Sequence, residues 1–286
     1  QQLSVAVGTG LNFTGAGNVD IDALVNGDTL TSIDASAMTG TLTIDGIDAS
    51  ALVFKGSAGV NAIGVAGLNA SDQLIGGVAT TDSVTASAVT GLTATTGKLN
   101  IQDLESVIIQ ATGANTIDTS LMTGVTSLAY SGATPGTQTV TNLAASGMAI
   151  ALGSATAEFD AAAELDITLA DSTGSSDSVT VNVDNRGGAD TDAVIDMSGV
   201  ETLNLAVLDL DTGNNAQVVL TNADVATVNV TAGFAGAVLA MGTLDTLTTT
   251  VDTTAYNGDV TFTGANTDGI TFNSAAATAN SAVTLG

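Results

Sequence analysis

The chain contains no cysteine, no histidine and no tryptophan among its 286 residues, and aromatic residues make up only 3%. Without cysteine there is no disulfide and no thiolate metal site. Without histidine there is no Ser-His-Asp triad, and the commonest general acid–base group is missing. The scarcity of aromatic rings also removes the platforms on which carbohydrate enzymes usually hold sugars. The sequence therefore predicts a protein that is not an enzyme.

Basic residues are almost as scarce. Lys55, Lys98 and Arg186 stand against 29 Asp and Glu residues, for a formal net charge of −26. Binding to phosphate needs basic side chains, so this balance excludes nucleic acid as a partner and disfavours an anionic membrane surface. No run of 18 apolar residues is present, which predicts no membrane insertion. A chain this acidic repels its own copies unless cations neutralise it.

The first ten residues have neither the basic segment nor the apolar segment of a signal peptide. We expect that a leader was removed or that export uses a signal outside this chain.

What the sequence does contain is short runs of alternating apolar residues, separated by Gly, Asn, Asp and Ser. In 193–207 we expect Val194 and Met197 to be buried together, followed by Leu203, Leu205 and Val207. Alternation over four to eight residues, closed by a turn residue, indicates a strand with one buried face. Comparable runs begin at Leu165, Val179, Val228 and Val260.

A degenerate motif, apolar-x-Thr/Ser-apolar, recurs along the chain. It begins at Leu30, Leu104, Val125, Val200, Val225 and Leu244. A second motif, Asp-Ala-Ser-Ala-Met-Thr-Gly at 34–40, returns at 118–124 and more loosely at 85–91. Self-similarity with a period of about 20–25 residues indicates a solenoid.

Strands spaced this closely leave no room for crossover helices, so we predict an all-β fold: a β-solenoid or β-helix of short strands, with β-sandwich domains as the alternative. The only proline, Pro135, and the Ala-rich segment 154–165 indicate a boundary. We expect an N-terminal β-repeat region at 1–135, a loop or short helix as connector at 136–165, and a C-terminal β-solenoid region at 166–286.

Three acidic turns are candidate calcium sites, because closely spaced oxygen ligands suit this hard cation. The expected ligands are Asp184, Asp190 and Asp192 in the first turn, Asp209, Asp211 and Asn214 in the second, and Asp171 and Asp177 in the third. The alternative is that these residues only form Asx-turns and accept backbone hydrogen bonds.

Threonine-rich faces offer a further interpretation. The pair Thr41 and Thr43 and the run Thr246, Thr248 and Thr250 resemble an ice-binding ladder. The solvent face of an ordinary strand has the same composition, and we favour that interpretation.

The segments 30–45 and 196–205, LTSIDASAMTGTLTID and DMSGVETLNL, resemble the repeat regions of bacterial surface-layer proteins and related large secreted proteins of the RTX type. That resemblance implies a β-solenoid, type I secretion with an uncleaved C-terminal signal, order that depends on calcium, and a lattice on the cell exterior. The family's glycine-aspartate nonapeptide is absent here, the nearest piece being 187–192, so its calcium sites do not carry over to this chain.

We therefore expect a structural protein of the bacterial cell surface that self-assembles into a layer or filament, with Ca²⁺ bridging carboxylates of neighbouring copies. Cell-surface polysaccharide is a further candidate partner. The alternative function is the stalk or repeat region of a large secreted adhesin.

Overall fold

The computed structural model describes most of the chain. The described residues are 2–4, 10–25, 29–48, 51–90, 92, 100–110, 113–131, 136–153, 163–184, 192–208, 216–221, 224–233, 237–274 and 282–285. Within these ranges there is no α-helix, and the strands form parallel sheets of a β-solenoid with a repeat of about 23 residues. In the same ranges, no helix is long and apolar enough to cross a membrane.

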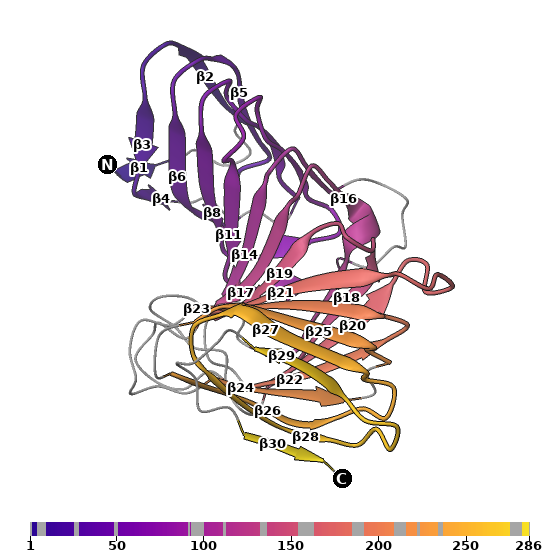
Figure 1. Cartoon of the computed structure of the whole chain (residues 1–286). Coiled ribbons are helices and arrows are strands. Elements are labelled where there is room, and N and C mark those ends of the chain that lie inside the picture. Colours follow the sequence, from indigo (N-terminus) through magenta and orange to yellow (C-terminus); the bar gives the residue numbers. More distant parts are fainter. Residues whose placement is uncertain are drawn as a thin grey trace. The chain divides into compact units, whose positions relative to one another are not determined.

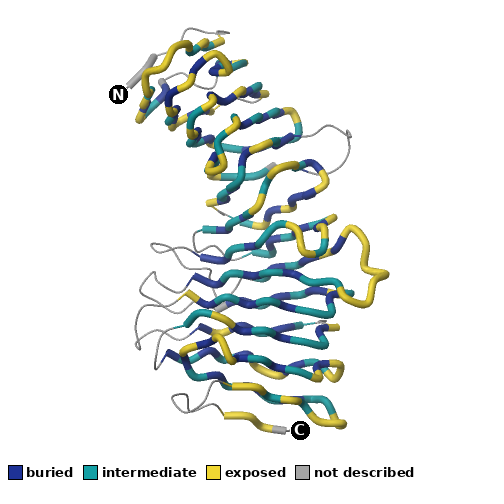
Figure 2. Tube along the Cα trace, turned by 45° about the horizontal axis from the view of Figure 1, so that its top comes forward, coloured by how far each residue is buried: buried dark blue, intermediate teal, exposed yellow. Residues whose placement is uncertain are grey.

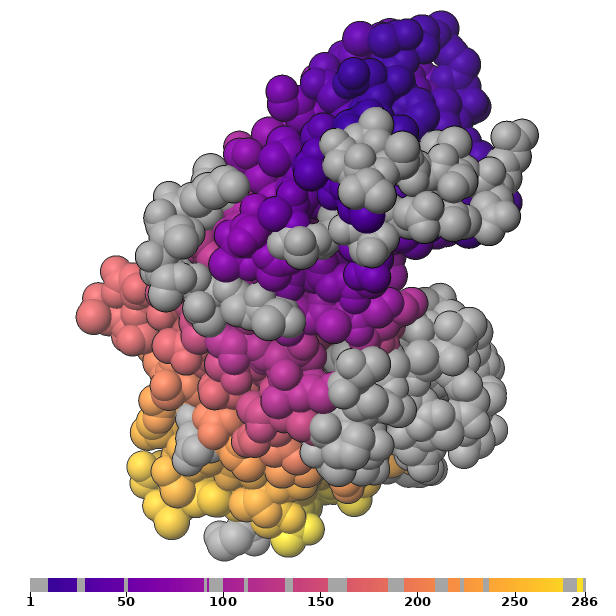
Figure 3. All heavy atoms as spheres, turned by 180° about the vertical axis from the view of Figure 1, so that it is seen from behind, coloured from indigo at the N-terminus to yellow at the C-terminus, as the bar shows by residue number. Residues whose placement is uncertain are grey.

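The chain divides into two compact units. Unit 1 comprises Gln1–Ala111 and Asn115–Ala129, and unit 2 comprises Thr112–Ala114 and Tyr130–Gly286. Strand β17 (Ser127–Ser131) contains the division. Figure 3 shows that successive segments within each unit follow one another in chain order, as expected when every turn packs on the one before.

Unit 1 has short strands, and some of its turns contribute three of them. Sheet I contains β2 (Gly10–Gly15), β5 (Ser32–Met38), β7 (Val53–Lys55), β10 (Gln73–Ile75), β13 (Ile101–Gln102) and β16 (Met122–Thr123). Sheet II contains β3 (Val19–Ile21), β6 (Leu42–Ile47), β8 (Asn61–Val65), β11 (Ser83–Ala86) and β14 (Ser106–Gln110). Two pairs complete the turns: β1 (Gln2–Ser4) with β4 (Ala23–Val25), and β9 (Leu68–Asn69) with β12 (Val89–Thr90). Strand β15 (Asn115–Asp118) and the 3-10 helix η2 (Thr119–Leu121) lie between β14 and β16 in the chain.

Unit 2 has longer strands, two for each turn (Figure 1). Sheet III contains β19 (Ala149–Leu152), β21 (Ser178–Asp184), β23 (Thr202–Leu208), β25 (Thr227–Ala232), β27 (Thr250–Tyr256) and β29 (Thr271–Ser274). Sheet IV contains β18 (Gly136–Leu143), β20 (Ala163–Leu169), β22 (Asp192–Ser198), β24 (Ala216–Thr221), β26 (Val238–Leu244), β28 (Asp259–Gly264) and β30 (Ala282–Leu285).

The register confirms the predicted repeat length. In sheet III, Thr202 pairs with Thr227, Thr227 with Thr250, and Thr250 with Thr271, which are steps of 25, 23 and 21 residues. One full turn of chain separates each pair. Two parallel strands need a connection of a dozen or more residues, which is usually a helix. Here the rest of the solenoid turn is that connection.

Two copies of the predicted motif do not fit this register. The copy at Leu30 leads into β5 of sheet I, whereas those at Leu104, Val200 and Val225 lead into strands of sheets II and III. The copy at Leu244 ends β26, and Leu247 after it is 53% exposed. The equivalent of Val225 is instead Thr248, a buried residue that sequence similarity alone could not align.

The core consists of apolar side chains stacked from turn to turn. In sheet III, Val179, Leu203, Val228 and Val251 are register partners, and all are buried. Figure 2 shows the alternation of buried and half-buried residues along these strands. In β22 the buried residues are Ala193, Ile195 and Met197, while Val194 faces outward, so the predicted pairing of Val194 with Met197 is wrong. The strand is continuous to Ser198, and period two therefore holds throughout it.

Several strands contain bulges. In β6, Asp45 and Gly46 together lie opposite Gly64, and Gly46 has φ +80°, a conformation that glycine adopts without strain. In β18, Asn142 has φ +57° at a similar shift of register. Such bulges expose two consecutive residues without disturbing the buried column on either side.

The expected loop or short helix at 136–165 differs from the structure. This range contains β18, β19 and the start of β20, while 154–162 lie outside the described residues. The proline and the glycines near 135 indicated a loop. The alternation from Gln138 to Leu143 is the stronger signal, and it forms the longest described strand.

Candidate functional site

Carboxylates are the main ionisable groups of this chain, and those within the described ranges lie in three kinds of environment. Some are buried acceptors of backbone hydrogen bonds, some close local turns, and some stand outward on strands. Lys55 is the only basic residue within the described ranges, since Lys98 and Arg186 fall outside them. The negative charge of the described part therefore has almost no internal counter-charge.

The predicted calcium ligands are only partly within the described ranges. Asp190, Asp209, Asp211 and Asn214 lie outside them. Asp192 begins β22, and Asp184 ends β21, where it is 8% exposed. Among the described residues, no group of three or more acidic side chains is close enough to hold a metal ion. The calcium turns at 184–192 and 209–215 remain predictions.

The third predicted turn is described in full. The Asp171 carboxylate accepts hydrogen bonds from the Thr173 amide at 3.0 Å and from the Thr173 hydroxyl at 2.6 Å, and these bonds lower the pKa of Asp171. Asp177 lies six residues on, where its amide donates to Glu201 Oε2 at 2.8 Å. Asp177 Oδ2 is buried and accepts no hydrogen bond from the described residues. Asp171 thus forms the Asx-turn of the alternative interpretation, and Asp177 keeps one unused ligand atom.

Buried carboxylates act as structural acceptors at the corners of unit 1. Asp72 is 2% exposed, and its two oxygens accept from the amides of Leu52 and Asn69, each at 2.8 Å. Asp82 is fully buried and accepts from the amides of Asn61 at 2.8 Å and Gly77 at 2.7 Å. These side chains satisfy amides where the chain turns between sheets and no ladder partner is available.

A second arrangement repeats at the start of strands in both units. The amide of Asp82 donates to Glu105 Oε2 at 2.7 Å, one turn later. The amide of Asp177 donates to Glu201 Oε2 at 2.8 Å in the same way. In both cases the glutamate occupies the second position of the apolar-x-Thr/Ser motif. This variable position of the motif can therefore link consecutive turns through a side chain.

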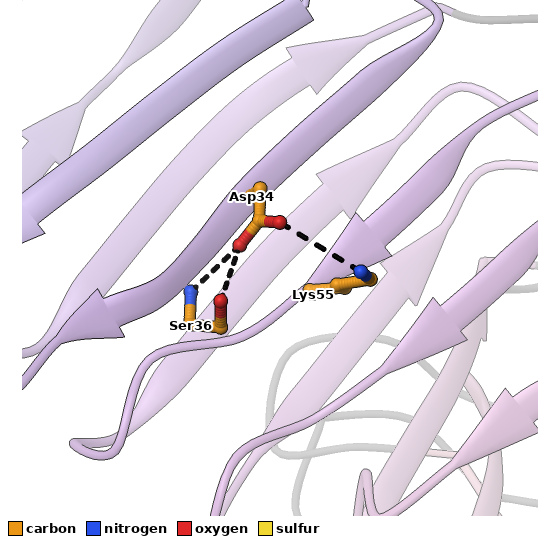
Figure 4. Close-up of polar contacts among 3 residues, drawn as sticks. All are labelled: Asp34, Ser36 and Lys55. Carbon is orange, nitrogen blue, oxygen red and sulfur yellow. Dashed lines mark hydrogen bonds and ion pairs between the residues drawn. The ribbon is translucent and has the colours of Figure 1, made fainter.

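The Asp-x-Ser/Thr sequences form a common local structure. Asp34 accepts from the amide and hydroxyl of Ser36 at 3.0 and 2.6 Å (Figure 4). Asp118 accepts from the amide and hydroxyl of Ser120 at 2.9 and 2.6 Å. The copies of the motif at 34–40 and 118–124 thus share one local hydrogen-bond pattern, although Asp34 lies in β5 and Asp118 caps η2. Lys55 Nζ lies 3.8 Å from Asp34 Oδ2 (Figure 4). The bonds from Ser36 and then the ammonium of Lys55 hold the pKa of Asp34 below its usual range.

Sheet IV brings two outward carboxylates together. Asp166 of β20 and Asp196 of β22 are direct register partners, between the buried pairs Leu165–Ile195 and Ile167–Met197. Like charges directly opposite on adjacent strands repel each other. Partial burial, and then the charge of Asp196, raise the pKa of Asp166. A divalent cation bound between these two groups would relieve the repulsion.

Unit 1 also has an oxygen-lined groove of about 550 Å³ beside the bulge of β6. Asp45 and Asp48 contribute carboxylates, and Thr85, Ser87 and Gln110 contribute hydroxyl and amide groups. The Asp45 carboxylate lies directly over Gly64, where any side chain would collide with it. We name this the acidic groove. Its groups can coordinate a cation or hydrogen-bond a hydroxyl-rich ligand.

Sequence reasoning missed both the Asp166–Asp196 pair and the acidic groove. Each aspartate stands alone in an alternating strand, and the step from Asp166 to Asp196 is 30 residues, longer than the repeat. A signal was present in the sequence, since both lie in an apolar-Asp-apolar triplet. Only the register shows that the two triplets are adjacent.

The threonines interpreted as solvent faces of strands also differ from that expectation. Thr246 lies in a turn and Thr248 is buried, so that Thr246, Thr248 and Thr250 share no outward face. Thr41 precedes β6 and only Thr43 is in the strand. Threonines do align in register at Thr202, Thr227, Thr250 and Thr271 of sheet III. A shorter alignment in sheet IV joins Thr243, Thr263 and Thr284.

Comparison with protein-family models gives no match, and comparison with curated proteins and with solved structures gives none either. The class that fold and residues define is thus an acidic parallel β-solenoid.

Proposed function

We propose that this chain is a structural protein of the bacterial cell exterior, which self-assembles into a surface layer or filament with Ca²⁺ bridging carboxylates of neighbouring copies. The observation that carries the proposal is the in-register pair Asp166–Asp196, in which two outward carboxylates face each other. With a net charge of −26, the acidic surfaces of two copies repel each other unless cations bind between them. Calcium suits oxygen ligands contributed by two partners, because its coordination number and geometry are flexible.

The solenoid supports a structural role for a second reason. Its turns repeat the same strand spacing, so that any contact made by one turn is available again on the next. Contacts that are individually weak then add through multivalency. The chain has no cysteine and almost no lysine. This composition is expected of a protein outside the cell, and it agrees with the resemblance to surface-layer proteins.

The test is removal and return of calcium. In calcium, we expect electron micrographs of purified protein to show ordered layers or filaments, and EDTA should disperse them and lower the melting temperature. Magnesium at equal concentration is the control for ionic strength, since it prefers a stricter geometry and keeps its own water. Assemblies and melting temperatures unaffected by EDTA would show that cation bridging is wrong.

The acidic groove favours a second candidate, the stalk of a large secreted adhesin. Its carboxylate, hydroxyl and amide groups suit the hydroxyls of a cell-surface polysaccharide. A monomeric rod in calcium that binds a polysaccharide, with binding lost in Asp45→Ala, would support the adhesin over the lattice.

A further inference from the structure

One outward face of unit 2 is nearly uncharged. It is formed by alternate residues of β21, β23, β25, β27 and β29, and we name it the Thr/Asn face. Its residues are Ser178, Thr180, Asn182, Thr202, Asn204, Ala206, Thr227, Asn229, Thr231, Thr250, Asp252, Thr254, Thr271 and Asn273. All of them are half-buried or exposed. In a chain with 29 acidic residues, this face contains a single carboxylate.

The face is built as two parallel ladders. Register partners Ser178, Thr202, Thr227, Thr250 and Thr271 form a hydroxyl ladder. Two positions along each strand, Thr180, Asn204, Asn229, Asp252 and Asn273 form the second ladder. Rungs lie about 4.8 Å apart and the two ladders about 6.7 Å apart, as the geometry of β-sheets requires.

Side chains of the second ladder bond to one another. Asn229 Nδ2 donates to Asn204 Oδ1 at 2.9 Å. The Asp252 carboxylate accepts from the Thr254 amide at 2.9 Å and from its hydroxyl at 2.6 Å. The single charge of the face is thus held by local donors, and the bond between Asn204 and Asn229 orients these two amides.

We infer that the Thr/Asn face is the surface through which two copies of the chain pack against each other. The inference rests on the proposed self-assembly and adds a metal-free contact to it. Burying charges without partners is costly. The Thr/Asn face has one carboxylate, whereas the outward side of sheet IV has Glu164, Asp166, Asp196 and Asp259. Contact through the Thr/Asn face also keeps the acidic surfaces of two highly charged copies apart.

The regular spacing of the two ladders indicates which partner fits the Thr/Asn face. Identical ladders of the same spacing can interdigitate along their whole length, as polar and Asn ladders do in paired sheets. A second copy of the chain has the same ladders and therefore the same spacing. The face measures roughly 20 by 24 Å from strand length and spacing, so that a pair of faces buries roughly 1,000 Å². That is the lower limit for a specific interface, and the association should be weak and reversible.

The test uses charge of both signs at the centre of the face. Thr227→Lys and Thr227→Glu are compared with Thr261→Lys and Thr261→Glu, which change a half-buried outward threonine of β28 in sheet IV. Sedimentation velocity is measured over about a hundredfold range of concentration in EDTA. We expect wild type to self-associate, both Thr227 variants to weaken association by about tenfold or more, and both Thr261 variants to leave it unchanged.

Comparing Thr227→Lys with Thr227→Glu distinguishes burial of the face in an interface from a general effect of net charge on association. If Thr227→Glu weakens association while Thr227→Lys strengthens it, only net charge matters and the inference is overturned. Circular dichroism checks the fold of each variant, and Thr202→Lys with Thr202→Glu replace any variant that loses β structure.

The remaining outcomes distinguish this inference from the proposed function. Association that requires calcium and is equal in wild type and Thr227 variants overturns the face alone. A wild-type chain that stays monomeric with and without calcium overturns both. If wild type is monomeric and inhibits ice growth, and the Thr227 variants lose that inhibition, the face binds ice. Self-association through the face is then wrong.

Discussion

The carboxylate of Asp82 accepts a hydrogen bond of 2.8 Å from the backbone amide of Asn61, which lies one turn earlier in unit 1. Its second oxygen accepts from the amide of Gly77 at 2.7 Å, and the side chain is completely buried. Among the described residues Asp72, Asp82, Asp118 and Asp184 are buried, so these four carboxylates are not part of the surface charge. Some carboxylates are structural parts of the solenoid corner.

Asp82→Ala should destabilise unit 1 severely. The substitution leaves the buried amide of Asn61 and the half-buried amide of Gly77 without acceptors, at roughly 1–3 kcal/mol each. We expect a loss of about 3 kcal/mol in urea denaturation followed by circular dichroism. Asp20→Ala is the control, since Asp20 is exposed on β3, and it should change stability by less than about 0.5 kcal/mol. Equal effects of the two variants would contradict the role assigned to Asp82.

Gly77 should not tolerate a side chain. A Cβ there would overlap the carbonyl oxygen of Ser57 and lie 3.1 Å from Asn61 Nδ2. Because both neighbours belong to a buried corner, Gly77→Ala should lower stability by about 3 kcal/mol, measured as a fall in melting temperature. Gly17→Ala is the matched control, since a Cβ at Gly17 meets nothing within 4 Å. A Gly77→Ala protein as stable as Gly17→Ala would show that the corner is not packed as described.

Tyr130→Phe should stabilise the protein. The Tyr130 hydroxyl is buried without a hydrogen-bond partner among the described residues, and burial raises its pKa. Removing it takes away an unsatisfied polar group and keeps the ring, which should gain about 1 kcal/mol in urea denaturation. Tyr130→Leu should instead lose about 2 kcal/mol, because it leaves a cavity. Loss of stability in the Phe variant would mean that the hydroxyl has a partner.

Asp166→Asn should also stabilise the fold, but only where Asp166 is ionised. The pKa of Asp166 is raised in the folded state, so the contribution of this group to stability is complete below its ordinary pKa and is lost as pH rises through the folded value. At neutral pH the variant should gain about 0.5 kcal/mol, the size of one cross-strand pair. At pH about 3 wild type is protonated there, and the gain should disappear.

Thermal melts at the two pH values measure this difference. Saturating calcium provides a second comparison, since a cation bound between Asp166 and Asp196 would remove the repulsion. The gain from Asp166→Asn at neutral pH should then shrink in calcium and return in EDTA. A gain that calcium does not alter would argue against metal binding at this pair.

Much of the fold was predictable. The alternation Val179-x-Val181-x-Val183 predicts a strand with one buried face. The spacing of the Thr/Ser motif predicts turns of about 20–25 residues, and the observed repeat is about 23. The Asp-x-Ser sequence at 34–36 and its copy at 118–120 form the same hydrogen bonds because the interaction is local. In each case the physical cause lies within a few residues, or in a repeat that the chain itself displays.

The candidate sites were harder to predict from the sequence. Asp166 faces Asp196 across a step of 30 residues, and Asn204 bonds to Asn229 across 25. The step varies from turn to turn, because bulges and loops of different length absorb residues. Motif alignment consequently placed the last repeat at Leu244, whereas the register places it at Thr248.

By itself, the sequence determined the all-β solenoid class, the repeat length and the excess of carboxylates, because these depend on composition and local periodicity. Only the tertiary structure decided which carboxylates are buried acceptors, which pair across strands, and which face is left uncharged. Those properties depend on the register between turns, and a shift of one residue reverses which side of a strand faces outward.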